Sequence, residues 1–256
     1  MIIETTIELG EALFEHLLIL EIKDFEIFLE KHDLLNLETR VYYKIPELDP
    51  FVEVKISQLI DGYNEMVPKQ KSNFLETLPD DLQDFWTPVA GFDISVNKDS
   101  DKIVLMKDFG FGIGLHPSTI LILQEMKNEL VGVDAIVDIG SGSGILSLYA
   151  ASKGIMKIYA MEVDLKAIET MKENFVFNKF DAELIFNSET TPDDALYLAN
   201  MRPHELMKCE EILEKGQKII ISGLMKEDNL SENLNGFIQN KNLKKKSGLG
   251  DWISLS

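Results

Sequence analysis

The chain of 256 residues has few cysteines, few basic residues and no long apolar run. Its single cysteine, Cys209, excludes a disulfide framework and is typical of a reducing compartment, so we expect a cytoplasmic location. No apolar run approaches the roughly 18 residues that a membrane-spanning helix needs. The first residues alternate and carry acid, without the basic start and apolar centre of a signal peptide. These absences predict a globular protein without a membrane segment.

Basic residues are scarcest in the first hundred positions. The whole chain has 25 Lys and Arg against 44 Asp and Glu, a formal charge of −19. Residues 1–100 hold 8 basic and 21 acidic residues, a net charge of −13. Such a surface repels nucleic-acid phosphates and anionic membranes and attracts basic proteins. We therefore expect no direct nucleic-acid binding, no membrane binding, and either a basic protein substrate or a charge that serves solubility alone.

Two common nucleotide-binding patterns are also missing. The chain has no Gly-Lys-Ser/Thr, which excludes a P-loop. A glycine-rich segment does follow an apolar run at 138–144, Asp-Ile-Gly-Ser-Gly-Ser-Gly, but the third small residue of the dinucleotide fingerprint is Ile145 here. A tight strand-to-helix turn without that fingerprint favours an adenosyl ligand without phosphates. S-adenosyl-L-methionine is the candidate, and the alternative is an ordinary turn in which glycines only relieve crowding.

An acidic residue follows the glycine turn at the sequence distance expected for a ribose ligand. Glu162 lies 20 residues after Gly142, at the end of the next apolar run. In an open α/β sheet the acid that ends the second strand can bind an adenosine ribose, because a carboxylate offers two acceptor oxygens to a vicinal diol. Asp164 competes for this role, but we expect it to N-cap the helix that follows.

Apolar runs and helical periods alternate through the second part of the chain. Strands are expected at 134–139, 157–162, 182–187, 194–200 and 217–222, and helices at 145–153, 165–178 and 203–214. Strands that alternate with helices build a parallel, doubly wound sheet. Residues 242–256 form two further strands with only a short turn between them, so these must be antiparallel.

The first part of the chain follows a different pattern, and we divide the chain into segments 1–70, 71–107 and 108–256. Residues 1–70 have a strand–helix–strand–strand–helix order, which predicts a small α+β domain with a split βαβ unit. Its strands are expected at 2–9 and 37–45, and its helices at 11–20 and 51–63. Residues 71–107 are expected to be a linker region, with a short helix around 80–85.

Several motifs occur in a fixed order in the last segment. They are Gly-Phe-Gly-Ile-Gly-Leu-His-Pro-Ser-Thr at 110–119, the glycine turn at 138–146, Ala199-Asn200, Ser222-Gly223-Leu224 and Asp251-Trp252. Together they resemble the ribosomal protein L11 methyltransferase (PrmA) family over about residues 108–256, and the loop 110–119 is the most family-specific element. The resemblance implies a Rossmann-like class I methyltransferase domain, preceded by the small α+β domain. Its sheet would be mostly parallel and seven-stranded, with an antiparallel last strand.

The resemblance also implies roles for individual residues. Gly140 and Gly142 would bring their backbone against the amino-acid part of the cofactor S-adenosyl-L-methionine, and Thr119 would contact this cofactor. Asp138 would either order the turn or hold the cofactor's ammonium group through water. His116 is a candidate base, with a structural role at a helix start as its alternative. No metal site is expected.

Asn200 ends the strand expected at 194–200, at the carboxyl edge where ligands sit. Its side-chain carbonyl can accept an N–H from a substrate amine and direct the nitrogen lone pair at the methyl group. The alternative is an ordinary asparagine at a strand end. We therefore assign Asn200 to both the cofactor site and the acceptor site.

The chain departs from the family at several of these positions. Ile113 and Leu115 replace two threonines, Glu162 replaces the usual aspartate, and Met201-Arg202-Pro203 follows Asn200 in place of the family's apolar residues. We expect an S-adenosylmethionine-dependent protein N-methyltransferase that acts on an α-amine or a lysine of a ribosomal protein. Two alternatives stay open: a class I methyltransferase with another protein or a small molecule as substrate, and a cofactor-binding interaction module without activity.

Overall fold

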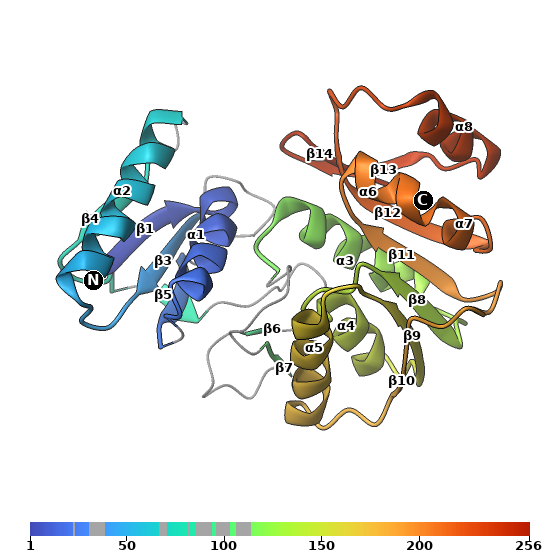
Figure 1. The fold of residues 1–256 in the computed structure, drawn as a ribbon, viewed down its shortest axis with the longest axis horizontal. Helices are drawn as coiled ribbons and strands as arrows, with labels where there is room; N and C mark the ends of the chain where they lie inside the picture. Colours follow the sequence, from blue (N-terminus) through green and yellow to red (C-terminus); the bar gives the residue numbers. More distant parts are fainter. Residues whose placement is uncertain are drawn as a thin grey trace.

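The computed structural model describes residues 1–22, 24–30, 39–66, 71–80, 82–84, 94–95, 103–105 and 114–256. Its described strands form two large sheets, one from the first part of the chain and one from the last. Figure 1 shows the first sheet in blue and cyan, and the second in green to red. A short parallel pair, β6 (Ile94–Ser95) with β7 (Ile103–Val104), lies between them in the sequence.

The described strands of the first sheet are antiparallel, in the order β4-β1-β3-β2-β5. They are β1 (Ile2–Thr6), β2 (Glu26–Glu30), β3 (Arg40–Lys44), β4 (Asn73–Leu75) and β5 (Leu82–Asp84), with helices α1 (Ile7–Ile19) and α2 (Pro50–Met66). Strand β3 lies between β1 and β2, so the predicted split βαβ unit is confirmed. Helix α1 begins earlier than expected because the Thr6 hydroxyl accepts the N–H of Leu9 and caps it.

Two strands of this sheet lie in the segment 71–107 that we expected to be a linker. Strand β4 pairs with β1, and β5 pairs with β2, so the first domain extends to at least Asp84. The short helix expected around 80–85 is wrong, since Leu82–Asp84 is a strand. Strands of three residues are too short to show a period, and they form because β1 and β2 offer unpaired edges.

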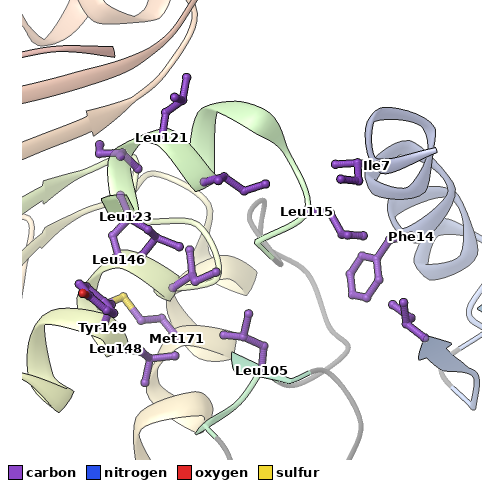
Figure 2. Packing of buried hydrophobic residues seen from close by; sticks show 14 of the residues in the cluster. Ile7, Phe14, Leu105, Leu115, Leu121, Leu123, Leu146, Leu148, Tyr149 and Met171 are labelled. Carbon is purple, nitrogen blue, oxygen red and sulfur yellow. The ribbon is translucent and has the colours of Figure 1, made fainter. Parts of the chain in front are cut away.

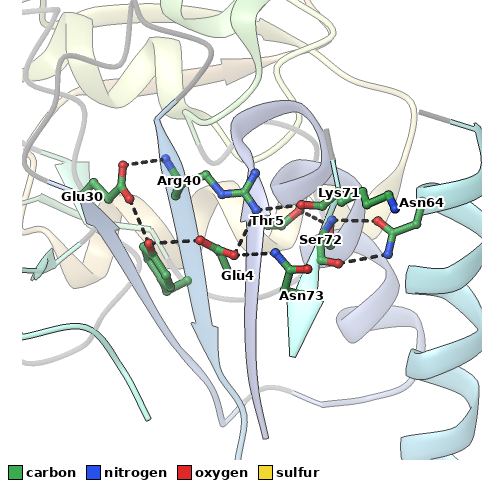
Figure 3. Close-up of polar contacts among 9 residues, drawn as sticks. Glu4, Thr5, Glu30, Arg40, Asn64, Lys71, Ser72 and Asn73 are labelled. Atoms are coloured by element: carbon green, nitrogen blue, oxygen red, sulfur yellow. Dashed lines mark hydrogen bonds and ion pairs between the residues drawn. The ribbon is translucent and has the colours of Figure 1, made fainter. Parts of the chain in front are cut away.

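The face of the first sheet that points away from its apolar core carries a network of polar side chains. The Glu4 carboxylate accepts the Asn73 amide at 2.7 Å and lies 3.3 Å from the Arg40 guanidinium. The Tyr42 hydroxyl donates to Glu30 at 3.0 Å, and Figure 3 shows these contacts running across the strands. Burial opposes ionisation of Glu4, but the bonds from Asn73 and Arg40 outweigh it and lower the pKa of Glu4. This face therefore presents acidic groups in fixed positions.

The second sheet is formed within residues 114–256, all of which are described, and has the order β10-β9-β8-β11-β12-β14-β13. Its strands are β8 (Ala135–Ile139), β9 (Lys157–Met161), β10 (Glu183–Phe186), β11 (Leu196–Asn200), β12 (Lys218–Met225), β13 (Lys245–Leu249) and β14 (Trp252–Leu255). Strand β14 is antiparallel to both of its neighbours, while β10, β9, β8, β11 and β12 are mutually parallel. The mostly parallel seven-stranded sheet with an antiparallel last strand is confirmed.

Helices pack on both faces of this sheet. They are α3 (Pro117–Glu129), α4 (Ile145–Ser152), α5 (Leu165–Phe177), α6 (Pro203–Leu206), the 3-10 turn η2 (Met207–Cys209), α7 (Glu210–Leu213) and α8 (Glu232–Asn240). Neighbouring residues of β8 point to opposite faces, so Ile136 joins the core under α3, α4 and α5, and Val137 joins the core under α6, α7 and α8. The helix expected at 203–214 is divided into α6, η2 and α7.

The strand order reverses beside β8, where β9 lies on one side and β11 on the other. In open α/β sheets, ligands bind at the carboxyl ends of the strands at such a switch point. The ends of β8, β9 and β11 carry Gly140, Glu162 and Asn200 respectively. The topology therefore brings three of the predicted site residues to one edge of the sheet.

Leu115 connects the apolar cores of the two parts of the chain. It is fully buried, and its Cδ1 would lie 3.4 Å from a Cβ placed on Gly10 of α1. Figure 2 shows Leu115 beside Ile7 and Phe14, with the side chains of α3 and α4 on its other side. A leucine in place of the family's threonine thus provides packing between the two parts. Ile113, the other departure in this loop, lies outside the described residues.

Among the residues described, no helix is both long and apolar enough to cross a bilayer.

We expect Leu115→Ala to lower the free energy of unfolding by about 2 to 5 kcal/mol, because it removes a buried side chain where two cores meet. Denaturant titration followed by circular dichroism measures the change. Leu165→Ala is the matched control, because the Leu165 side chain is 74% exposed, and it should change stability by less than about 0.5 kcal/mol. Equal effects of the two substitutions would contradict the role given to Leu115.

Candidate active site

A cavity of about 860 Å³ lies at the carboxyl ends of β8, β9 and β11. Gly140, Gly142, Glu162, Asn200 and His116 all line it, so the structure brings together five of the residues singled out in the sequence. The other two predicted residues, at positions 119 and 138, are buried and do not line the cavity. Among the described residues, no group of His, Cys, Asp and Glu side chains is arranged to hold a metal ion.

The glycine turn after β8 needs its glycines for two different reasons. Gly140, Gly142 and Gly144 have φ of 70°, 52° and 79°, a conformation that other residues adopt only with strain. A Cβ on Gly144 would lie 2.6 Å from Cγ of Met171, so this glycine lets α5 pack on the turn. Gly140 and Gly142 line the cavity instead, where neither adds a side chain of its own between the backbone and a ligand. Crowding therefore explains Gly144, whereas ligand approach fits the first two.

Glu162 holds the turn and the loop after β9 by accepting three backbone N–H groups. One carboxylate oxygen accepts from Gly142 at 3.0 Å, and the other accepts from Val163 at 2.7 Å and from Asp164 at 3.0 Å. A carboxylate has about four acceptor positions, so one remains for a ligand hydroxyl. The Asp164 side chain accepts the N–H of Lys166 and caps α5, which confirms the role predicted for Asp164. Glu162 thus lies in the cavity with its orientation fixed.

Asn187 is a residue of this site that the sequence reasoning missed. It follows β10, lines the cavity, and accepts the N–H of Glu162 at 2.9 Å through its side-chain oxygen. Its amide group donates to the carbonyl of Glu162 at 2.8 Å, so the two bonds clamp this backbone from the neighbouring strand end. Its φ of 49° is one that asparagine tolerates better than most residues. Position alone would not reveal it, because the contact spans 25 residues.

Asp138 is buried at the end of β8 and orders the turn. Its carboxylate accepts the hydroxyl of Ser147 in α4 at 2.6 Å. Burial raises the pKa of Asp138 to about 6; the Ser147 bond opposes this rise and the charge of Glu162 adds to it. Because Asp138 lies behind the cavity wall, its geometry favours the first of its two predicted roles, which is to join the strand to the helix.

Asn200 lines the cavity and carries a side-chain oxygen without a hydrogen-bond partner among the described residues. Its amide nitrogen donates to the Thr119 hydroxyl at 3.0 Å, which fixes the side chain from α3. Its Oδ1 is buried and has no hydrogen-bond partner among the described residues, and the same is true of the Ser141 hydroxyl in the glycine turn. Buried polar groups are nearly always paired, so the unpaired oxygen of Asn200, a residue that lines the cavity, favours a ligand there. Thr119 acts here by orienting Asn200, while its predicted contact with a cofactor stays a prediction.

His116 has the properties of a structural residue. Its Nδ1 accepts the N–H of Ser118 at 3.2 Å and so caps α3, which places the proton of a neutral ring on Nε2. Burial, aided by the charge of Arg202, lowers the pKa of His116 to about 4. The ring packs edge-on against Trp252 with centroids 4.4 Å apart, and the Arg202 guanidinium lies 5.3 Å from the Trp252 centroid. His116 is poorly suited to act as a base, because its Nδ1 lone pair is engaged, its Nε2 carries the proton and its pKa is low.

Cys209 also lines the cavity, but its chemistry does not suggest a nucleophile. Burial and the charge of Glu205 raise the pKa of the Cys209 thiol, so the thiol stays protonated. The lining of the cavity therefore combines a glycine turn, a fixed carboxylate and a residue with an unpaired amide oxygen. Such a set binds and orients ligands rather than attacking them.

The chain is similar to proteins of a known family. A sequence model of the family described as ribosomal protein L11 methyltransferase (PrmA) matches residues 86–256, which is more than half of the chain. The ribosomal protein L11 methyltransferase of Aquifex aeolicus is 29% identical over 225 residues, covering 82% of this chain and 88% of that protein. The one of Halalkalibacterium halodurans is 26% identical over 170 residues, covering 60% of this chain and 53% of that protein. The chain thus spans about half the length of the Halalkalibacterium halodurans relative.

A solved structure supports the fold. The crystal structure of ribosomal protein L11 methylase from Lactobacillus delbrueckii subsp. bulgaricus aligns with a TM-score of 0.52 and 23% sequence identity. The alignment covers 64% of this chain and 92% of that chain.

We expect Asp138→Asn to stabilise the protein increasingly as the pH rises. The folded state keeps the Asp138 proton up to about pH 6, whereas the unfolded chain releases it near pH 4. Ionisation therefore destabilises the folded wild type progressively across this window. Between about pH 4 and pH 7, the free energy of unfolding of the variant should gain about 1 to 3 kcal/mol over that of the wild type. Urea titrations at a series of pH values measure this difference, and a difference that does not change with pH would contradict the assignment.

Proposed function

Because the chain belongs to the ribosomal protein L11 methyltransferase (PrmA) family, we propose that it transfers a methyl group from S-adenosylmethionine to an amino group of ribosomal protein L11. The observation that carries this proposal is the buried, unpaired Oδ1 of Asn200 in the cavity wall. This oxygen can accept one N–H of an incoming amine. The lone pair of the amine nitrogen is then directed away from Asn200 and into the cavity.

The residues present fit S-adenosylmethionine. Gly140 and Gly142 line the cavity without side chains of their own, beside the place for the amino-acid part, and the cavity of about 860 Å³ has room for the cofactor and an acceptor side chain. Glu162 retains about one acceptor position for a ribose hydroxyl, so a second hydroxyl would compete with one of its three backbone N–H groups. Asp164 is engaged as a helix cap, which leaves Glu162 as the ribose ligand.

The reaction needs little chemistry from the chain itself. The cofactor supplies a methyl group that is already activated, so the protein contributes proximity and alignment. Asn200 would position the acceptor nitrogen, with Thr119 holding the Asn200 amide in place. The acceptor must be neutral when it attacks: an α-amine has a pKa near ~8 and a lysine near ~10.4, and burial lowers either value. Its proton leaves to solvent, since the Nδ1 lone pair of His116 is engaged in capping α3 and its Nε2 already carries a proton.

The first domain would recognise the acceptor protein. We assigned this role to residues 1–70, and the pairing of β4 and β5 extends the domain to at least Asp84. Its polar sheet face holds Glu4 and Glu30 in fixed positions, and the first hundred residues carry a charge of −13. Both features favour a basic protein as substrate and disfavour nucleic acid. The expected cytoplasmic location stays a prediction.

The proposal is tested with purified ribosomal protein L11 and S-adenosylmethionine labelled in its methyl group. We expect label to enter the protein, and mass spectrometry of its peptides to locate it on an amine. Cofactor binding by calorimetry without transfer to L11 would contradict the proposed substrate. Transfer to another protein or a small molecule would then support a different class I methyltransferase, and no transfer at all would support an inactive binding module.

Glu162→Gln should weaken binding of S-adenosylmethionine by about 1 to 3 kcal/mol, because an amide replaces a carboxylate that accepts charge-assisted hydrogen bonds. Isothermal calorimetry measures the affinity. Glu183→Gln, at an exposed position on the neighbouring strand β10, is the matched control and should bind as the wild type does. An unchanged affinity of Glu162→Gln would refute the ribose assignment.

Asn200→Ala should lower the turnover rate by about 100-fold, because the acceptor nitrogen loses the group that aligns it. Its cofactor affinity should change much less than its rate, which separates alignment from cofactor binding. Asn240→Ala, at an exposed position that ends α8, serves as the control with normal kinetics. A variant at position 200 with wild-type turnover would remove Asn200 from the mechanism.

A further inference from the structure

The main chain of Met201 is held firmly at the edge of the second sheet. Its N–H donates to the carbonyl of Ser222 at 3.1 Å. Gly223 has a φ of 86°, and a Cβ there would lie only 2.4 Å from the Met201 carbonyl oxygen, so the two backbones are in direct contact. Arg202 adds a bond to the Gly223 carbonyl at 2.9 Å and an ion pair with Asp228 at 2.7 Å. Any movement at Met201 must therefore come from its side chain.

That side chain lies along the cavity side of Gly140. A Cβ on Gly140 would meet Cε and Sδ of Met201 at 3.3 Å and its Cγ at 3.4 Å. Three consecutive atoms at nearly equal distance mean that the thioether lies lengthwise over the glycine backbone. Gly140 is itself fixed, because its N–H donates to Met161 at 2.7 Å. Both Gly140 and Met201 line the cavity, so the thioether fills the part of the cavity beside the turn.

This is the place that the proposed function assigns to the amino-acid part of the cofactor. A methionine side chain, CH₂-CH₂-S-CH₃, has the same chain of atoms as the arm of S-adenosylmethionine that leads from the α-carbon through sulfur to the methyl group. The two groups therefore match in shape. The methionine side chain is also unbranched and rotates about three bonds, so it can leave the subsite without moving the backbone.

We infer that the Met201 side chain is a displaceable plug, which rests on Gly140 in the methionine subsite and swings out when the cofactor's amino-acid arm enters. The inference rests on the proposed function, since it needs S-adenosylmethionine as the ligand. It gives Met201-Arg202-Pro203 a role: the sequence that follows Asn200 in this chain anchors a flexible side chain over Gly140. Cofactor binding then includes the work of displacing the plug.

Calorimetry with two ligands tests the plug. S-adenosylmethionine carries the amino-acid arm, whereas adenosine has the base and ribose but no arm and leaves the plug in place. Met201→Ala should bind S-adenosylmethionine about 3- to 10-fold more tightly than the wild type, because no side chain has to leave a packed position. Its affinity for adenosine should be unchanged. Weaker or equal binding of S-adenosylmethionine by Met201→Ala would overturn the plug and make Met201 an ordinary wall residue.

Two controls keep the result interpretable. Met207→Ala removes a methionine that packs against the same core and does not line the cavity, so it should leave both affinities unchanged. Met201→Leu keeps most of the volume of the side chain, and it should not gain affinity. An NMR spectrum of the wild type with ¹³C-labelled methionine methyl groups gives a second readout. The Met201 signal is identified as the one that is missing from the spectrum of Met201→Leu, and it should shift when S-adenosylmethionine is added. A signal that does not shift would overturn the plug even if Met201→Ala failed to fold.

The outcomes separate the two proposals. If the wild type binds S-adenosylmethionine and the Met201 variants do not differ as described, the plug is wrong and the proposed function stands. If neither the wild type nor Met201→Ala binds S-adenosylmethionine, the proposed function fails and the plug fails with it.

Discussion

The hydrogen bonds around Glu162 hold the ends of three neighbouring strands in register, and the site depends on them. At the end of β9, Met161 accepts a hydrogen bond from the N–H of Gly140, and Glu162 accepts one from the N–H of Gly142, both in the turn after β8. Asn187, after β10, clamps the backbone of Glu162 from the other side. Because the strands are parallel, all of these groups meet at one edge. The same carboxylate therefore serves the fold, by ordering the turn, and the site, by facing the cavity.

A second anchor holds the acceptor side of the cavity. The segment after β11 is bound to the end of β12 through Gly223, whose lack of a side chain lets the Met201 backbone approach. The Arg202 side chain holds the same segment by donating to the Gly223 carbonyl, and its guanidinium lies over the Trp252 ring. Thr119 then orients Asn200 from α3. The polar groups that would face a ligand are thus set on rigid elements, and the Met201 side chain is the flexible part between them.

The sequence predicted those features that depend on local chemistry. The parallel strands of the second sheet were visible as long apolar runs, and the cap formed by Asp164 was visible from its place before a helical period. Features that depend on contacts distant in sequence were not visible. Strands β4 and β5 form on the free edges of β1 and β2, and three residues carry no detectable period. Asn187 lies in a stretch with no motif, and only the strand order brings it to Glu162.

The departures from the family bear on whether the site is still built for a ligand. Leu115 replaces a threonine, yet it is buried between the two cores, so its apolar character has a structural cause unrelated to lost activity. Met201 and Arg202 replace apolar residues of the family, yet Asn200 lines the cavity and its oxygen is unpaired among the described residues. Burying an unpaired amide oxygen costs about 1 to 3 kcal/mol, and native structures keep few such groups. A protein that only needed the cavity as a core would fill it or pair that oxygen, so the arrangement at Asn200 favours a working acceptor site over an inactive module.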